Sequence, residues 1–444
     1  MLQSAAVRPS TSGNGLLRRL PPKCQALLRE LGNLADQRQV ALYLVGGVVR
    51  DLLLGRKTLD LDLTVEGDGL AFARSVAGRY KASVVQYERF ATARLVLPDG
   101  QKIDIASTRR ESYADPAALP KVEPSSVRVD LFRRDFTINA MAVQLNAGNF
   151  GLLHDPYSGQ RDLRSKTLRV LHEESFRDDP TRIFRAIRFM QRFGFSLESG
   201  SRRLLAEAAA ANLISRLSGP RLRNEVLLLL AEHQPSRATD WLVRLNLLRF
   251  LHPRLRYTRR VKRLLDAVSP ACAWWAKLRS APSVERPVIC LMALLSEAGP
   301  SILRSVAQRM NLSSGQSAAI DWSGSQTDLI LKRLLQNREL RPSQVYRLLI
   351  GLPPEALVLL AAKMQLPAAG REARRCRQRL ARYMKRDRHA AIAVRGEDLK
   401  KLGLKPGPRF KSILDRLLGA RLDGKVKTEA EEREMAYRMV ARSG

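Results

Sequence analysis

The change in hydrophobic periodicity near residue 163 constrains the fold of this chain more than any other feature. Between residues 41 and 145, short apolar runs alternate with turn residues, and Pro98-Asp99-Gly100 is typical of a hairpin. From residue 173 to residue 444, apolar residues recur at helical spacing. The pattern predicts an α/β head followed by an all-α neck, body and tail.

The chain has 444 residues, which is more than one hydrophobic core usually holds. Within the head, residues 112–127 contain three prolines and no clear periodicity, so we expect a long functional loop there. We expect a flexible basic N-terminus, a head, a neck, a helical body and a helical tail at residues 1–20, 21–162, 163–235, 236–325 and 326–444.

Positive charge dominates the composition. The sequence contains 77 Lys and Arg residues against 43 Asp and Glu residues, a formal net charge of +34. A genome that favours arginine codons explains arginine over lysine, but it does not explain the scarcity of acids. A field this positive favours a polyanionic partner such as a nucleic acid. Because aromatic residues make up only 6% of the chain, a platform that stacks single-stranded bases is disfavoured.

The cysteine and histidine patterns exclude several kinds of site. Four cysteines lie far apart without a CxxC pair and five histidines show no HExxH spacing, so neither a disulfide framework nor a zinc site is expected. The sequence has no run of 18 uncharged apolar residues, so no membrane span is expected. We expect a cytoplasmic protein without an obligatory protein partner, and organellar import through residues 1–20 is the alternative.

A basic segment occupies residues 371–388 in the C-terminal half. It holds nine Lys and Arg residues against Glu372 and Asp387. A solvated helix face and a phosphate-contacting face are equally compatible with this pattern. The arginines that we expect to contact RNA are Arg371, Arg374, Arg375 and Arg379.

Two glycines and an arginine precede a short apolar helix in residues 43–65, YLVGGVVRDLLLGRKTLDLDLTV. Gly46 and Gly47 lie where a strand is expected to turn into a helix, which lets the backbone approach an anion closely. Arg50 falls on the first turn of that helix, and a guanidinium can bind phosphate oxygens through two parallel hydrogen bonds. This stretch therefore predicts a phosphate-binding turn.

Acidic residues follow the phosphate-binding turn. Strand alternation places Asp60 and Asp62 on one face. Carboxylates this close repel each other unless a cation lies between them, and Mg²⁺ commonly binds one or two carboxylates together with substrate phosphates. Asp104, in the expected strand KIDIAST, is the candidate third acid of a two-metal site. Ordinary solvated strand aspartates are the alternative for these residues.

The chain is similar to class II tRNA nucleotidyltransferases and bacterial poly(A) polymerases, members of the DNA polymerase beta superfamily. The resemblance rests on LVGGVVRDLLLGRKTLDLDL, on DLFRRDFTINAMA (130–142), on ESFRDDPTRIFRAIRFMQRFGF (174–195) and on DLKKLGLKPGPRFKSILDRLLGA (398–420). It touches head, neck and tail, and it implies a polymerase beta-like nucleotidyltransferase sheet in the head. The residues that it implies for the triphosphate and metal sites are Gly47, Arg50, Asp60, Asp62 and Arg134.

The resemblance also implies a base-reading pattern in the neck. The family pattern is Glu-Asp-x-x-Arg, whereas residues 178–182 of this chain are Asp-Asp-Pro-Thr-Arg. The departure at Asp178 leaves Asp179 and Arg182 in place, and its effect on selectivity stays open. Arg185 and Arg188 continue the arginine edge of this helix at every third residue, so we assign both to the nucleotide site.

Physical chemistry supports the base-reading pair without the family. Asp179 and Arg182 lie three residues apart, so their side chains can meet on one helix face. A carboxylate acceptor beside a guanidinium donor matches the amino group and ring nitrogen of cytosine and of adenine. Uracil and guanine present a carbonyl to the carboxylate, so CTP and ATP are the expected substrates. Asp179 before Pro180 is also a good helix N-cap, which is the alternative role.

The family resemblance and the base-reading pair together favour a template-independent nucleotidyltransferase that adds CCA to the acceptor end of tRNA. The tRNA would be held through its backbone and shape. Addition of A alone, addition of CC alone and poly(A) synthesis are the alternatives within the family. Members that add only CC typically lack a flexible loop, and residues 112–127 tell against that option. A basic RNA-binding module with a decayed pocket is the non-enzymatic alternative; it would lack Asp60 or Asp62, and both are present.

Overall fold

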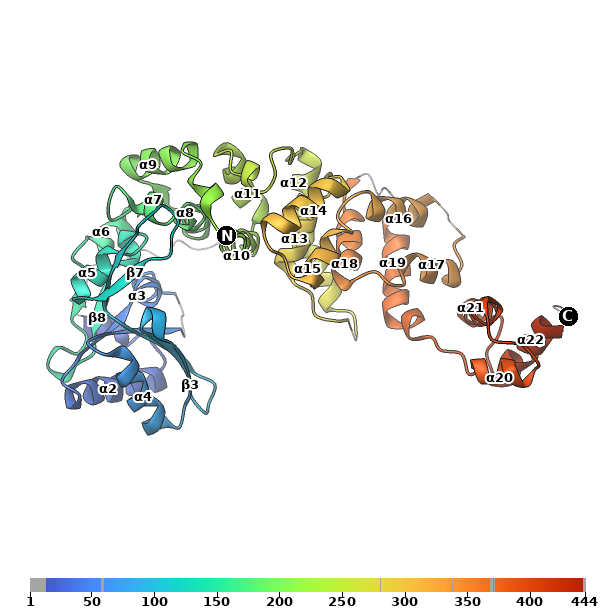
Figure 1. Cartoon of the computed structure of the whole chain (residues 1–444), viewed down its shortest axis with the longest axis horizontal. Coiled ribbons are helices and arrows are strands. Elements are labelled where there is room, and N and C mark those ends of the chain that lie inside the picture. Colours follow the sequence, from blue (N-terminus) through green and yellow to red (C-terminus); the bar gives the residue numbers. More distant parts are fainter. Residues whose placement is uncertain are drawn as a thin grey trace. The chain divides into compact units, whose positions relative to one another are not determined.

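The computed structural model describes residues 13–56, 60–279, 281–336, 339–367, 370 and 372–441. The chain divides between Leu217 and Ser218 into two units, and this boundary lies within the segment expected to form the neck. The strands all belong to the first unit, whereas the described residues of the second unit form helices and no strand (Figure 1). This arrangement confirms the predicted α/β head followed by a helical region.

A seven-stranded mixed sheet forms the centre of the first unit, in the order β3-β4-β5-β2-β1-β8-β9. β2 and β5 are parallel, and the other neighbouring strands are antiparallel. The strands of this sheet are β1 (Ala41–Val45), β2 (Leu61–Glu66), β3 (Ser83–Tyr87), β4 (Thr92–Val96), β5 (Lys102–Ser107), β8 (Ala142–Gln144) and β9 (Leu153–His154).

Strand alternation gives the sheet two different faces. Leu61 and Leu63 of β2 and Ile103 of β5 are buried on the face covered by α4 (Gly69–Tyr80), which packs on β2, β4 and β5. α2 (Pro22–Gln37) packs on β1 and buries its own row of leucines. Asp62 and Asp104 alternate with the buried residues, so they lie on the opposite face of the sheet.

Helices and short strands complete the first unit. α8 is amphipathic, because it buries Ile183, Phe184 and Ile187 while arginines follow its other edge. The expectation that strands end near residue 163 is wrong. β10 precedes α8 in the sequence and β11 follows it, and these two strands form a short parallel pair. These elements are α3 (Gly47–Leu53), α5 (Val127–Phe132), α6 (Gly159–Arg164), α7 (Ser175–Asp178), α8 (Thr181–Phe193), α9 (Ser199–Ala210), β10 (Thr167–Leu168) and β11 (Ser196–Leu197).

The segment expected to be a long loop is largely a hairpin. β6 (Arg109–Ser112) pairs with β7 (Lys121–Pro124), and only the residues between them form a loop. Two of the three prolines lie in that loop and the third ends β7, positions where a missing amide removes little pairing. Proline content therefore concealed a two-stranded structure.

The N-terminal arm is also more ordered than expected from residue 13 onward. α1 (Gly13–Leu17) is followed by a turn, and Leu16, Leu17 and Leu20 are buried. Arg19 Nη1 donates a hydrogen bond to the carbonyl of Leu52 at 2.6 Å. Residues 1–12 of the predicted arm lie outside the described residues. Apolar residues between the basic ones are what attach this segment to the fold.

The second unit is a stack of helices around an apolar core. α12, α13 and α18 pack on one another, and α13 and α18 are buried on nearly all sides. Its helices are α10 (Gly219–Leu230), α11 (Pro235–Arg244), α12 (Arg259–Ala276), α13 (Arg286–Leu294), α14 (Pro300–Arg309), α15 (Ser314–Ile320), α16 (Ser325–Gln336), α17 (Pro342–Leu349), α18 (Pro354–Lys363), α19 (Ala373–Lys385), α20 (Gly396–Lys401), α21 (Pro408–Leu422) and α22 (Glu429–Ala441).

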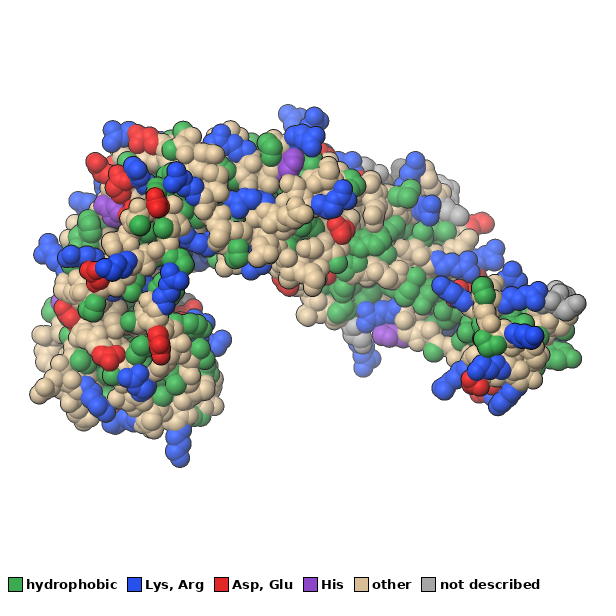
Figure 2. Space-filling view, in the orientation of Figure 1, with side chains coloured by type: hydrophobic (Ala, Val, Ile, Leu, Met, Phe, Trp, Pro, Cys, Tyr) green, Lys and Arg blue, Asp and Glu red, His purple; other side chains and the backbone are tan. Residues whose placement is uncertain are grey.

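A small core of its own holds the last three helices, with Leu399, Ile413 and Leu417 at its centre. Figure 2 shows many Lys and Arg side chains over this α20–α22 region. Within the described residues, no single helix has the length and apolarity to cross a membrane; the pair α17 and α18, bent by 116°, passes that test only when taken together.

Candidate active site

One cavity of about 610 Å³ in the first unit collects most of the residues predicted to bind a nucleotide. Its walls come from the β1–α3 turn, the start of β2, the root of the β6–β7 hairpin, residues 133–139 and α8. The predicted residues that line it are Gly46, Gly47, Arg50, Asp60, Asp62, Arg134, Asp179, Arg182, Arg185 and Arg188.

The diglycine turn joins β1 to α3 as predicted, but its chemistry differs from the prediction. Gly46 has φ +74°, and a Cβ on it would lie 2.8 Å from Arg134 Nη1, so both the backbone and the space require glycine. The Gly46 amide donates to the carbonyl of Met141 at 3.3 Å. That amide is therefore bound within the fold, and the glycine serves to bring the Arg134 guanidinium against the turn.

Arg50, the predicted phosphate ligand, lines the cavity but is held tightly within the protein. The residue is only 6% exposed. Its Nε and Nη2 donate to the two carboxylate oxygens of Asp51 at 2.9 and 3.0 Å, and Nη1 donates to Asn139 Oδ1 at 2.6 Å. The guanidinium carbon also lies 5.2 Å and 4.9 Å from the ring centroids of Phe189 and Phe193. Arg50 thus connects α3 to α8.

Arg134 lines the cavity and has one buried donor without a partner. Its Nη2 donates to Asp130 Oδ2 at 3.0 Å, whereas its buried Nε has no hydrogen-bond partner. Its charge opposes the rise that burial causes in the pKa of Asp62, so the guanidinium lies within electrostatic reach of that carboxylate. A buried N–H without a partner is costly, and an oxygen of a bound phosphate would satisfy it.

The two acids predicted to hold a metal lie together at the cavity. Asp60 is exposed immediately before β2, and Asp62 is half-buried within the strand. Burial raises the pKa of Asp62 above its usual value, and the charges of Asp104 and Asp60 raise it further, against the opposing charge of Arg134. Carboxylates that oppose each other's ionisation are stabilised by a hard cation, so Asp60 and Asp62 fit Mg²⁺.

Asp104, the predicted third acid, is beside Asp62 but turned to another partner. The Cα atoms of Asp62 and Asp104 are register partners in the parallel β2–β5 pair. The Asp104 carboxylate accepts from Arg94 Nε and Nη2 at 2.7 and 2.8 Å, and it does not line the cavity. Accordingly, the described residues contain no group of three or more His, Cys, Asp or Glu side chains that could hold a metal.

The predicted base-reading pair is at the other end of the cavity, with each member bound to different groups. Asp179 Oδ1 accepts from the amide and the hydroxyl of Thr181 at 3.0 and 2.6 Å, so Asp179 does cap the start of α8. The buried Arg182 donates through Nη1 to Ser175 Oγ at 2.6 Å and through Nη2 to the carbonyl of Arg133 at 2.7 Å. These bonds fix the guanidinium of Arg182 at the cavity wall.

Asp135 anchors the arginine edge of α8 to the sheet. Arg185 donates to Asp135 Oδ2 through Nε and Nη2 at 2.8 and 2.6 Å, while Asn139 donates to Asp135 Oδ1 at 2.8 Å. Burial alone would raise the pKa of Asp135, but the charge of Arg185 and the hydrogen bond from Asn139 hold it below its usual value. Arg188 and Arg192 extend the basic edge along the same cavity.

Comparison with known proteins agrees with this geometry. Residues 42–169 match the Poly A polymerase head domain, and residues 194–258 match a probable RNA and SrmB-binding site of polymerase A. The A-adding tRNA nucleotidyltransferase of Geobacter sulfurreducens is 41% identical over 95% of this chain and 48% of its own length. That of Halalkalibacterium halodurans is 33% identical over 87% of this chain and 86% of its own length.

The chain belongs to the tRNA nucleotidyltransferase family. It spans about half the length of the Geobacter sulfurreducens relative. Among solved structures, a CCA-adding enzyme in its apo form is 35% identical, with a TM-score of 0.81 over 97% of this chain and 99% of that one. The Thermotoga maritima CCA-adding enzyme complexed with tRNA is 33% identical, with a TM-score of 0.75 over the same shares. These comparisons confirm the resemblance seen in the sequence motifs.

For a tRNA nucleotidyltransferase, Asp178 is the position that departs from the family pattern. The structure places Asp178 outside the cavity, with its Oδ2 4.0 Å from His172 Nδ1. Burial, with the nearby charge of Arg182, lowers the pKa of His172 to about 4, so that imidazole is neutral at neutral pH. Asp178 therefore lies near His172 and is not one of the residues that line the cavity.

Several residues that line the cavity were missed in the sequence. Arg133, Asp135 and Asn139 belong to the same RRDFTINA motif as Arg134, and Arg192 continues the helical spacing of the α8 arginines, so a signal existed for these four. Tyr113 follows β6 and donates to Glu111 Oε2 at 2.8 Å, and nothing in the sequence linked this pair to the neck.

The basic segment at residues 371–388 contains α19 of the second unit. Arg374 and Arg375 are exposed, and Arg375 pairs with Glu372 at 2.9 Å. Arg379 instead donates to the carbonyl of Leu334 at 2.9 Å, so part of its hydrogen bonding caps α16. Arg371 lies outside the described residues.

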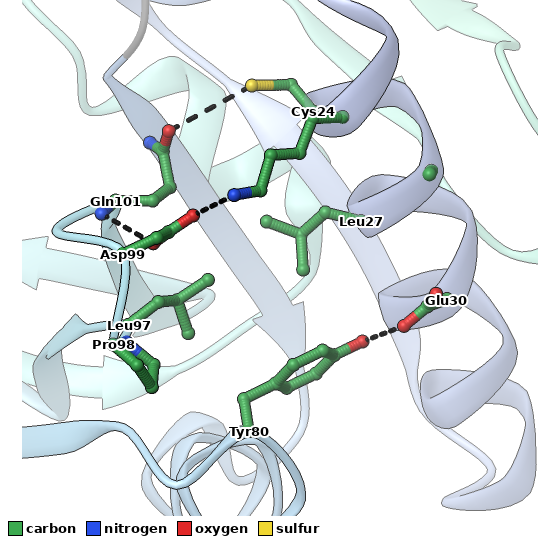
Figure 3. A pocket seen from close by; sticks show the side chains of 10 residues that line it. Cys24, Leu27, Glu30, Tyr80, Leu97, Pro98, Asp99 and Gln101 are labelled. Atoms are coloured by element: carbon green, nitrogen blue, oxygen red, sulfur yellow. Dashed lines mark hydrogen bonds and ion pairs between the residues drawn. The ribbon is translucent and has the colours of Figure 1, made fainter.

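A second, mostly apolar cavity of about 320 Å³ lies on the helix-covered side of the sheet, among α2, the end of α4 and the β4–β5 turn (Figure 3). Tyr80 and Glu30 form a hydrogen bond at 2.5 Å across its rim, and Lys23 pairs with Asp99 at 2.5 Å. None of the residues predicted to bind a nucleotide or a metal lines this cavity.

Proposed function

We propose that the chain transfers AMP from ATP to the 3′ end of tRNA, as an A-adding tRNA nucleotidyltransferase. One observation carries the proposal: the cavity brings the acids of β2, the unsatisfied Arg134 and the base-reading residues Asp179 and Arg182 together. Three curated relatives that are similar over more than four fifths of this chain are A-adding enzymes, which supports ATP as the substrate.

The triphosphate would lie at the end of the cavity formed by Gly46, Arg134 and the acids of β2. Arg134 Nε would donate to a phosphate oxygen, since it has no partner of its own. Mg²⁺ held by Asp60 and Asp62 supplies, when bound, a lowered pKa for the RNA 3′-hydroxyl and a positive charge beside the pyrophosphate. The 3′-oxygen then bonds to the α-phosphorus as the bond to pyrophosphate breaks.

The base would lie against Asp179 and Arg182. Adenine offers an amino donor to the carboxylate of Asp179 and a ring nitrogen to the guanidinium of Arg182. Because Ser175 and the carbonyl of Arg133 hold that guanidinium in place, it cannot turn to suit a different base at little cost. Guanine and uracil would set a carbonyl against the carboxylate, and a buried polar group left unpaired is strongly unfavourable.

Addition of the whole CCA sequence is the second candidate. The same donor and acceptor pattern suits cytosine, and the solved relatives with high structural similarity are CCA-adding enzymes. The β6–β7 hairpin is present, which is the segment whose absence would favour addition of CC alone. A addition and CCA addition therefore differ in whether the chain also uses CTP.

Three tRNAs that end before the first C, after the first C and after CC would each be incubated with Mg²⁺ and with ATP, CTP or both. An A-adding enzyme extends only the tRNA ending in CC, by one residue and with ATP alone. A CCA-adding enzyme extends all three when both nucleotides are present. Long A tails would indicate a poly(A) polymerase, and no extension of any tRNA would refute nucleotidyl transfer by this chain.

tRNA is the proposed polynucleotide partner. The net charge of +34 supports backbone contacts, and the exposed Arg374 and Arg375 of α19 are the proposed phosphate ligands in the second unit. Contacts of this kind position the acceptor end without reading its sequence.

A further inference from the structure

The ion pair between Arg94 and Asp104 has a specific geometry. The Arg94 guanidinium donates Nε to Oδ1 and Nη2 to Oδ2, at 2.7 and 2.8 Å, so one arginine occupies both oxygens of this acid. The side chains of Arg94 and Asp104 are 55% and 34% exposed. Because both side chains are partly exposed, water and salt compete with this pair, although its bidentate geometry makes it stronger than most surface pairs.

Sheet register places this pair in line with the metal site. Asp62 on β2 is opposite Asp104 on β5, and Asp104 is opposite Arg94 on β4. Directly opposite residues project from the same face of a sheet, so Asp104 stands between Asp62 and Arg94. Asp104 therefore has two alternative partners, a cation at Asp62 or the guanidinium of Arg94.

The face continues beyond Arg94 as an exposed strip on β3 and β4. Val85 of β3 is opposite Arg94, and Tyr87 is opposite Thr92. Val85 and Tyr87 are 54% and 51% exposed, although both have large apolar surfaces. An aromatic ring and an apolar side chain beside a guanidinium suit the bases and phosphate of a single-stranded RNA end.

We propose that Arg94 is a positioning residue that holds Asp104 away from the metal site until metal and RNA are bound. When Asp104 turns toward a cation shared with Asp62, Arg94 loses its carboxylate partner and binds the phosphate next to the RNA 3′-hydroxyl instead. The exchange couples metal binding to RNA binding. This inference rests on the proposed nucleotidyl transfer and assigns to Arg94 a role in that reaction.

The first test measures metal binding directly, in the full chain without nucleotide, by titrating Mn²⁺ and detecting it by electron paramagnetic resonance. Arg94→Met should lower the dissociation constant for Mn²⁺ about two- to fivefold, because Asp104 no longer has a competing partner. Lys102→Met is the matched control, since Lys102 is a basic residue of β5 on the same face that forms no ion pair in the part of the chain that the structure describes. Equal effects of the two substitutions would mean that only net charge matters, and this would overturn the proposal.

Asp104→Asn gives a second arm. In a chain with Asp104→Asn, Arg94→Met should leave Mn²⁺ affinity unchanged, since the acid that Arg94 restrains is gone. An equal effect of Arg94→Met with and without Asp104 would show that the two residues act independently. That outcome would also overturn the proposal.

The third arm concerns RNA. Arg94→Met should raise the KM for tRNA about two- to fivefold, more than it lowers kcat, even though it tightens metal binding. Arg94→Lys should restore part of the RNA affinity, because an ammonium binds phosphate as a point charge but cannot hold both oxygens of Asp104. A lower KM for tRNA in Arg94→Met would contradict the proposed exchange of partners between Asp104 and Arg94. If the wild-type chain transfers no nucleotide, the proposed function fails; if it transfers nucleotide and Arg94→Met changes neither Mn²⁺ nor tRNA binding, only the role of Arg94 fails.

Discussion

α8 and α19 are both 13-residue amphipathic helices rich in arginine, yet they use their arginines differently. On α8, Arg182 is buried against Ser175 and the carbonyl of Arg133, and Arg185 binds Asp135. On α19, Arg374 and Arg375 are exposed. Fixed guanidiniums in a cavity can discriminate between hydrogen-bonding patterns, whereas exposed ones can only attract charge. Both helices carry several arginines, and partners from distant segments make the difference.

The contrast between α8 and α19 requires the cavity beside α8 to be catalytic. Asp62→Ala should reduce nucleotide transfer at least about 1,000-fold, because it removes a carboxylate proposed to hold Mg²⁺. Single-turnover extension of tRNA with ATP measures this loss. Asp99→Ala is the control, since Asp99 is an acid on the helix-covered side of the sheet, and it should keep its activity. Transfer near the wild-type rate by Asp62→Ala would refute the metal assignment.

The difference in burial between the two helices predicts different stability effects. Asp135→Ala should lower the free energy of unfolding by about 3 kcal/mol, because Asn139 and Arg185 lose a buried acceptor. Glu372→Ala, which removes the exposed partner of Arg375, should cost less than about 0.5 kcal/mol. Denaturant titration of both variants compares them, and similar losses would mean that the α8 arginines are no more firmly held than those of α19.

A substitution at Asp179 tests whether the start of α8 selects the base. Asp179→Asn keeps an oxygen that can cap Thr181, but it presents an amino donor to the base. We expect the preference for ATP over GTP and UTP to fall about 10- to 100-fold while the melting temperature changes little. Competition between nucleotides for a tRNA ending in CC measures the preference. An unchanged preference would leave Asp179 as a helix cap alone.

The smallest expected effect concerns α19. Replacing Arg374 and Arg375 with alanine should weaken tRNA binding several-fold and reduce the slope of log affinity against log salt by about 1 to 2. Replacing Arg433 and Arg438 of α22 is the matched control, because it removes the same charge from exposed positions of another helix. Binding across a salt series measures the slope, and equal slopes for the two double variants would assign no specific role to α19.

Local patterns predicted the parts of the structure that depend on neighbouring residues. Alternation separated Asp62 from the buried Leu61 and Leu63 of β2, and the change of periodicity predicted the helical region. Errors arose where tertiary contacts outweigh local signals: residues 13–20 are held by buried leucines, and residues 121–124 form a strand despite their proline.

Contacts between distant segments could not be predicted in this way. Arg50 and Asn139 are 89 residues apart in sequence, and Arg182 binds a carbonyl 49 residues earlier. Such bonds depend on how α8 returns to the sheet, and no spacing rule reaches that far. For the same reason the sequence predicted Arg50 as a phosphate ligand without indicating its hydrogen bonds to Asp51 and Asn139.

The position of Arg50 between the turn after β1 and two phenylalanines of α8 has a mechanical consequence. Through these contacts Arg50 connects the wall proposed for the triphosphate to the helix proposed for the base. The span between those walls is then set by the protein and not by whichever molecule enters. A fixed distance between the two walls would favour nucleotides of one length. Phe189 and Phe193 would then help to determine the size of the nucleotide, although neither side chain carries a polar atom.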